Sequence, residues 1–183
     1  VLNCSTGAGD GRWRDIDETN VWSNFSYDSE VSLEIDFSAG GPTSYDLFTV
    51  TGSVRIDEFF GHVETQLSNT ACTFKIVLFS ANGSVDLTAA SASVAAAVVE
   101  ATFVRNAPSD EALDYGNPSA GPAIVENTST KNPKISIDVV ADPTAITTIR
   151  LVASADLAAG VVHWHCHWMP LTDVGFLNHY VAP

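Results

Sequence analysis

Apolar and polar residues alternate one by one in several short stretches of the chain. The clearest stretch is residues 30–38, in which every second side chain is apolar: Val31, Leu33, Ile35 and Phe37. Successive side chains of a β-strand point to opposite faces, so a period of two predicts a strand with one buried face. Turn-forming residues follow at positions 40–42, where Gly-Gly-Pro interrupts the pattern.

About nine short strands separated by turns are expected along the chain. The clearest cover residues 30–38, 47–56, 59–65, 71–79, 135–139, 147–153, 161–169 and 175–181. Gly52 predicts a bulge or a close backbone approach, and Asn82-Gly83 lies in a predicted hairpin turn. The Ala-rich residues 87–99 fit one short helix, a helical turn or a covering loop, and residues 106–122 are expected to form a long loop. This pattern predicts an all-β fold, an antiparallel β-sandwich or jelly-roll-like domain over residues 29–183.

The first 28 residues have a different composition. They are rich in Gly, Ser, Asn and Asp, yet they hold four large aromatic side chains: Trp13, Trp22, Phe25 and Tyr27. A solvated tail seldom carries that many. We therefore expect residues 1–28 to form an N-terminal arm that packs on its own domain or on a neighbouring subunit through these residues.

The charge balance excludes several classes of partner. The 183 residues include 22 Asp plus Glu but only 8 Lys plus Arg, for a net charge of −14, while 45% are hydrophobic. That apolar fraction is ample for a packed core. An acidic surface repels phosphate and anionic lipid, so neither nucleic acid nor membrane is an expected partner. No calcium-binding loop of the Asp-x-Asp-x-Asp-Gly type occurs, and no signal peptide or membrane span is expected.

The three cysteines do not form a disulfide framework. Cys4, Cys72 and Cys166 are odd in number and far apart, which favours free thiols and a protein made in a reducing cytoplasm. Cys72 and Cys166 lie in apolar runs, where cysteine behaves as a small hydrophobic residue.

The stretch from Val161 to Leu171, VVHWHCHWMPL, contains three of the five histidines. On one strand, His163, His165 and His167 share a face and are spaced by about 6–7 Å per pair. The opposite face carries Trp164, Cys166 and Trp168, which suit a core. We expect these histidines to form a row that faces solvent or a subunit interface. These three histidines remain candidate metal ligands, with zinc or nickel bound at a symmetry axis, because one strand spaces them too widely for one ion.

Residues 165–176 also resemble the last copper motif of multicopper oxidases. His165-Cys166-His167 is followed by Gly175-Phe176, but Leu171 stands where that family has a histidine. A copper centre of this kind needs two imidazoles as well as the thiolate. The other histidines, His62 and His179, belong to no His-x-His pair, so we do not expect a copper oxidase and regard the likeness as coincidental.

Other catalytic patterns do not occur. The sequence has no Gly-x-Ser-x-Gly elbow and no phosphate-binding Gly-rich loop, and the adjacent carboxylates Asp57-Glu58 and Asp110-Glu111 do not form a catalytic pair by spacing. We expect a protein that is not an enzyme and needs no cofactor. The four tryptophans could stack on sugars, which leaves a carbohydrate-binding module as an alternative, although core and interface packing is their expected role.

Three stretches together resemble β-rich virion structural proteins of tailed bacteriophages. The first is residues 50–65, with Thr51-Gly52-Ser53-Val54 and Gly61-His62-Val63-Glu64-Thr65. The second is residues 72–79, which lead to the turn at Asn82-Gly83. The third runs from Gly160 to Asp173 and ends with Trp168-Met169-Pro170-Leu171-Thr172-Asp173. The resemblance spans roughly residues 47–181.

This resemblance implies a capsid decoration (cement) protein. Such a protein would be assembled in the host cytoplasm, lie on the capsid surface, bind the major capsid protein and self-associate as a homotrimer. A tail, fibre or spike component is the alternative within the same class. The arm residues Trp13 and Trp22 would then be anchors at an interface, since buried aromatic side chains dominate interface energetics.

Overall fold

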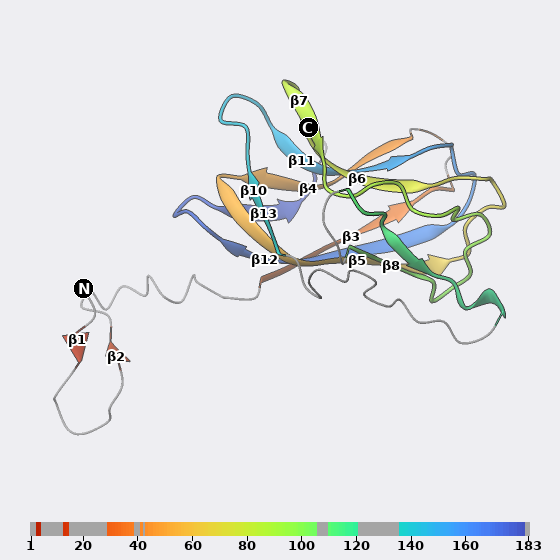
Figure 1. The fold of residues 1–183 in the computed structure, drawn as a ribbon, viewed down its shortest axis with the longest axis horizontal. Coiled ribbons are helices and arrows are strands. Elements are labelled where there is room, and N and C mark those ends of the chain that lie inside the picture. Colours follow the sequence, from red (N-terminus) through yellow and green to blue (C-terminus); the bar gives the residue numbers. More distant parts are fainter. Residues whose placement is uncertain are drawn as a thin grey trace.

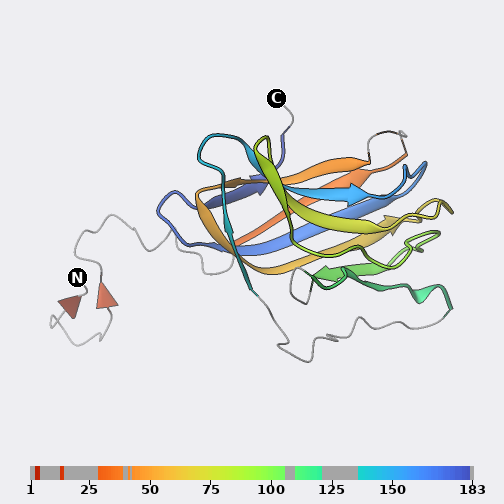
Figure 2. The same ribbon diagram turned by 45° about the horizontal axis from the view of Figure 1, so that its top comes forward.

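Two antiparallel sheets pack face to face in the computed structural model of the chain (Figures 1 and 2). The structure describes residues 29–38, 41, 43–105, 110–120 and 136–181, together with the backbone of two short paired strands, β1 (Asn3–Cys4) and β2 (Trp13–Arg14). The prediction of an all-β sandwich is therefore confirmed.

The first sheet has six strands in the order β3-β12-β5-β8-β9, with β10 also paired to β5. Its strands are β3 (Ser29–Asp36), β5 (Ser53–Thr65), β8 (Thr102–Arg105), β9 (Asp114–Gly116), β10 (Ile137–Val140) and β12 (Val161–Pro170). Strand β12 lies between β3 and the long strand β5. The edge of β5 that faces away from β12 pairs with β10 through Ser53–Ile56 and with β8 through Phe59–His62.

The second sheet has five strands in the order β13-β4-β11-β6-β7. They are β4 (Ser44–Thr51), β6 (Phe74–Ser80), β7 (Gly83–Asp86), β11 (Thr147–Ala153) and β13 (Phe176–His179). The predicted hairpin joins β6 to β7, and its register pairs Ser80 with Gly83, which leaves Ala81 and Asn82 as the turn residues.

Residues 47–56 do not form the single strand that their apolar pattern predicts. Gly52 ends β4 and begins the crossing to β5 in the other sheet, with φ near 60°. A side chain at this position would lie 2.9 Å from Thr172 and from Val174. The expectation of a close backbone approach at Gly52 is thus confirmed, and the prediction of one continuous strand is wrong. The close approach of Gly52 to Thr172 and Val174 occurs at the turn where the chain passes from one sheet to the other.

The Ala-rich segment forms a covering loop, one of its three expected structures. Within the described residues it contains no α-helix, and no helix there is long and apolar enough to cross a bilayer. Backbone bonds from Ser91 to Phe74, from Val94 to Cys72 and from Leu67 to Ala97 hold the segment along the sandwich. The prediction of a structureless loop over residues 106–122 is wrong in part. Short strand β9 pairs there with β8, and a 3₁₀ turn (Pro118–Ala120) follows.

The core is centred on Trp164, which is fully buried. Its indole packs between Phe59 and Phe103, with ring centroids 5.5 and 5.7 Å away. Gly61, on the neighbouring strand β5, makes room for it, because a Cβ there would lie 2.7 Å from the indole. The absence of a side chain at Gly61 therefore leaves room for the Trp164 indole on the core face of β5. The outward residues of β5 and β12 at the same point form the site described below.

A methyl group at Gly61 tests this packing. We expect Gly61→Ala to lower the free energy of unfolding by about 1–3 kcal/mol, the usual cost of overpacking a filled core. Urea denaturation followed by circular dichroism measures the change. Thr65→Ala, at an exposed position of the same strand, is the control and is expected to stay within about 0.5 kcal/mol of the parent. An unchanged midpoint for Gly61→Ala would contradict the close packing.

Candidate functional site

Strand β12 separates two rows of side chains, as its sequence predicts. Val162, Trp164, Cys166 and Trp168 are buried, whereas the alternate residues His163, His165 and His167 are half-buried on the outward face of the sheet. Because β12 is flanked on both sides, this outward face continues over β3 and β5. The histidine row therefore lies in the middle of a surface formed by three strands.

Strand β5 brings a fourth histidine to this surface. His62 lies directly opposite His163 in the ladder, and Phe60 lies opposite His165. The pairing then shifts, because Val162 faces Val63 while Val161 faces Thr65. Glu64 is the extra residue of this bulge. Bulges re-aim side chains, and this one places the Glu64 carboxylate beside two imidazoles.

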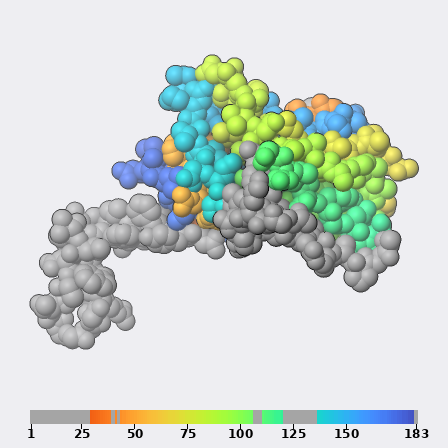
Figure 3. All heavy atoms as spheres, viewed as in Figure 1, coloured from red at the N-terminus to blue at the C-terminus, as the bar shows by residue number. Residues whose placement is uncertain are grey.

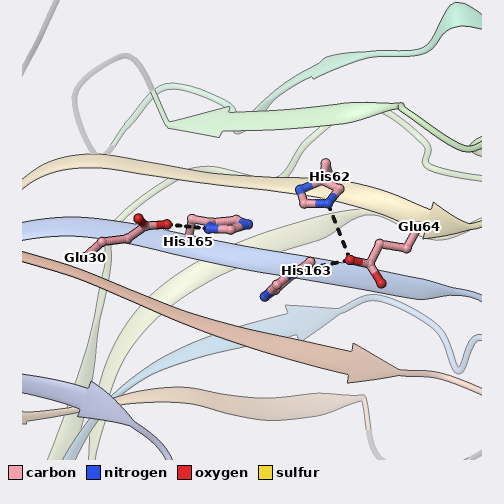
Figure 4. A network of polar contacts seen from close by, with 5 residues as sticks. All are labelled: Glu30, His62, Glu64, His163 and His165. Carbon is pink, nitrogen blue, oxygen red and sulfur yellow. Dashed lines mark hydrogen bonds and ion pairs between the residues drawn. The ribbon is translucent and has the colours of Figure 1, made fainter.

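Three imidazoles converge at this point. One ring nitrogen from each of His62, His163 and His165 lies within 4.8 Å of the others. The ring centroids of His163 and His165 are 4.4 Å apart, and His62 lies 5.5 and 5.4 Å from them. Figure 4 shows the three rings turned toward a shared space above β5 and β12. The rings of His163 and His165 lean together, whereas His167, the third histidine of the strand, lies outside this cluster.

Two carboxylates hold the two β12 imidazoles. Oε1 of Glu64 lies 3.2 Å from Nδ1 of His163 and 3.5 Å from Nε2 of His62. Oε1 of Glu30, on β3, lies 2.8 Å from Nδ1 of His165. A carboxylate only accepts hydrogen bonds, so Nδ1 of each β12 histidine carries the hydrogen and donates it. Each of the three strands thus contributes at least one residue to the network (Figure 4).

The second nitrogen of His165 is buried without a partner. The side chain is 16% exposed, and its Nε2 has no hydrogen-bond partner among the described residues. The ring of Phe60 stacks on it almost in parallel, with centroids 4.8 Å apart and planes 7° apart. Buried polar atoms normally have a hydrogen-bond partner. One that has none needs an explanation, such as a bound ion or a functional role.

The sequence predicted part of this group. His163 and His165 are among the expected candidates, whereas His167 lies outside the cluster that could hold an ion in the described part of the chain. His62, Glu30 and Glu64 were missed as members. Period two in residues 30–38 and 59–65 already puts all three on outward faces. Only the strand order and the register, which a single sequence does not reveal, show that these faces meet.

Cys166 is separated from the imidazoles by the sheet. Its side chain is fully buried on the core face, and its Sγ lies 4.0 Å from the backbone oxygen of His167. Burial raises the pKa of the Cys166 thiol, the charge of Asp57 raises the pKa further, and Arg105 opposes both. Because Sγ lies on the core face of β12, opposite the imidazoles, the thiol cannot join the histidines as a ligand of one metal. This geometry supports reading the resemblance to the copper motif as a coincidence.

The two tryptophans of β12 lie on its core face, like Cys166. Trp164 and Trp168 are buried in the core, as expected, so neither offers a face on which a sugar could stack. Of the arm residues, Trp13 is described only by its backbone in β2, and Trp22, Phe25 and Tyr27 lie outside the described residues. The expected interface role of these four residues stays a prediction.

The buried state of Cys166 has a direct chemical consequence. We expect iodoacetamide to leave Cys166 unmodified in the native protein and to alkylate it rapidly in guanidinium chloride, because the reagent needs an accessible thiolate. Mass spectrometry of the peptide that contains Cys166 measures the modification. Rapid alkylation of the native protein at Cys166 would show that the thiol is accessible and would reopen the possibility of a thiolate ligand.

Comparisons with known proteins add no further information on this site. No protein-family model, no curated protein and no solved structure matches the chain. The proposals that follow depend on the residues and geometry described above, together with the resemblance drawn from the sequence.

Proposed function

We propose that the chain is a non-enzymatic structural protein of a virion that acts by binding, and specifically a capsid decoration protein. In this proposal it self-associates, expected as a homotrimer, and binds the major capsid protein. The observation that carries the proposal is a group of exposed apolar side chains at one end of the sandwich, where the aromatic-rich N-terminal segment joins the domain.

This apolar end surrounds the crossing at Gly52. Its five members are large apolar side chains that are 41–68% exposed: Val140, Ile146, Leu171, Val174 and Phe176. The backbone of Ala141 donates to the oxygen of Gly52, and Val174 lies against the same glycine, so the two loops meet. Figure 3 shows the corresponding cyan and blue segments together at one end of the molecule. Exposed apolar groups that gather in this way mark interaction sites.

The N-terminal segment enters the domain at this end. Ser29, the first residue of β3, lies opposite Trp168 of β12, and β12 ends two residues later, at Pro170. The ring of Phe176 packs edge-on against Trp168, with centroids 5.4 Å apart. With β1 paired to β2, residues 15–28 could extend up to roughly 45–50 Å, which is long enough to reach a neighbouring subunit. In this proposal, the four aromatic side chains of the N-terminal segment would bury apolar area against the apolar end of a neighbour.

The physical driving force in this proposal is burial of apolar area. A standard interface removes about 1,600 Å² of surface from water, and each Å² of apolar area contributes about 25 cal/mol. The net charge of −14 keeps the remaining surface from binding the nucleic acid inside a particle. Both features suit a protein that covers a capsid.

The proposal predicts self-association through the apolar end. We expect Phe176→Asp, deletion of residues 1–28 and Trp22→Ala each to raise the dissociation constant for self-association, because each removes apolar contact area or places a charge in it. Sedimentation equilibrium of the full chain and of each variant measures the constant, and circular dichroism checks that the β domain remains folded.

Val99→Asp is the matched control. Like Phe176, Val99 is an exposed large apolar side chain, but it lies in the covering loop beside the far end of β5, where Glu100 bonds to Val63. We expect this variant to associate like the parent. If the parent chain is monomeric at high concentration, or if Phe176→Asp and Val99→Asp behave alike, self-association through the apolar end does not occur.

Location on the particle tests the finer part of the proposal. We expect the protein to co-sediment with intact virions and, after heads and tails are separated, to remain with the heads at a fixed ratio to the major capsid protein. Quantitative mass spectrometry of the two fractions measures this ratio. Recovery with the tails would favour the alternative of a tail, fibre or spike component, and absence from particles would overturn both.

A further inference from the structure

We propose that His62, His163 and His165 bind one transition-metal ion, with Zn²⁺ as the best fit, on the outward face of β5 and β12. This metal site is independent of the proposed structural role. It differs from the metal site considered from the sequence, because all three ligands come from one chain and because His62 takes the place of His167.

The first argument is convergence. Three imidazole nitrogens from two adjacent strands lie within 4.8 Å of one another. A tetrahedral zinc ion with Zn–N bonds of 2.0–2.1 Å requires its ligand nitrogens to be about 3.4 Å apart. Small rotations of half-buried side chains would close that difference, and the backbone pairing of His62 with His163 already fixes the positions of their strands.

The second argument is the hydrogen-bond chemistry of His165. Its Nδ1 donates to Glu30, so in the neutral ring Nε2 carries a lone pair and no hydrogen. That lone pair is buried and receives no hydrogen bond from the described residues. Figure 4 shows Glu30 at one end of the ring and His62 and His163 beyond the other. A buried lone pair directed at two more imidazoles is the arrangement that a cation would satisfy.

The third argument is the outer shell. Metal-binding histidines almost always donate their second ring nitrogen to a carboxylate, a carbonyl or water, which fixes the tautomer and the ring orientation. His163 has this partner in Glu64, and His165 has it in Glu30. Glu30 and Glu64 are therefore positioning residues. Their negative charges also favour a cation at the surface between them.

The donor set selects the class of metal. Imidazole nitrogens suit Zn²⁺, Ni²⁺ and Cu²⁺, whereas Mg²⁺ and Ca²⁺ prefer oxygen ligands. Three histidines leave one tetrahedral position for a water molecule on the solvent side, as in other three-histidine zinc sites. The thiol of Cys166 is on the opposite face of the sheet, so no sulfur ligand takes part.

Calorimetric titration of the tag-free full chain with ZnCl₂ tests the site. A Cys4→Ser background removes the N-terminal thiol as a competing ligand. We expect one Zn²⁺ per chain, a melting temperature that rises with Zn²⁺ concentration, and no comparable effect of Mg²⁺ or Ca²⁺. His62→Gln and His165→Gln are expected to abolish this stoichiometric binding, whereas His179→Gln, an exposed histidine of the other sheet, should bind as the parent does.

Glu30→Gln tests the outer shell. We expect zinc affinity to fall by roughly 10- to 100-fold, the usual effect of losing such a partner. Glu34→Gln removes the same charge from an exposed position of the same strand and controls for electrostatics, so its loss should be smaller. Substitution by Co²⁺ adds a direct readout, because tetrahedral Co²⁺ gives intense visible absorption that His62→Gln should remove.

Three outcomes would overturn the proposal: no stoichiometric zinc binding by the parent, unchanged affinity in His62→Gln, or one zinc shared by two or three chains. The last outcome would place the metal between subunits. Circular dichroism of each variant shows whether it folds. Should the more buried His165→Gln fail to fold, His62→Gln decides the question, because His62 is the more exposed side chain.

Discussion

The alternation of β12 is the constraint on which the rest of the structure depends. One strand carries the largest core side chain, Trp164, and the imidazoles of the outward face, because successive residues point to opposite sides. A shift of one residue in its pairing would place the histidines in the core and the tryptophans in water. Burial of Trp164 against Phe59 and Phe103 therefore fixes the register and, with it, the position of His163 beside His62.

Local patterning in the sequence was enough to predict the sandwich and most of its strands. The strands predicted at residues 30–38 and 147–153 correspond to β3 (Ser29–Asp36) and β11 (Thr147–Ala153). The prediction was wrong at residues 47–56. Apolar residues occur both before and after Gly52, so the pattern alone does not show that the chain crosses there from β4 to β5 in the other sheet. The histidine cluster was predicted in part, since strand order is a long-range property that pairs His62 with His163 across about a hundred residues.

Part of the acidic composition is concentrated on the outward face of the first sheet, around the imidazoles. Strands β3 and β5 place four glutamates at outward positions around the imidazoles: Glu30, Glu34, Glu58 and Glu64. Read from composition alone, such residues favour solubility. Their arrangement does more, because two of them each accept a hydrogen bond from an imidazole and leave its other nitrogen available. The carboxylates at this face thus favour a cation.

The two proposed surfaces are far enough apart to act independently. Strand β5 begins at Ser53, next to the apolar end, and carries His62 nine residues later. At about 3.3 Å per residue, His62 lies roughly 30 Å from Ser53 along β5, and His165 lies roughly 20 Å from Leu171 along β12. Substitutions so distant and without shared partners usually have additive effects. A metal on β5 and β12 would therefore clamp two strands that already pair along their length, leaving the apolar end free to bind whatever the proposed particle presents. The metal site and the apolar end can fail or succeed separately, because they share no residue.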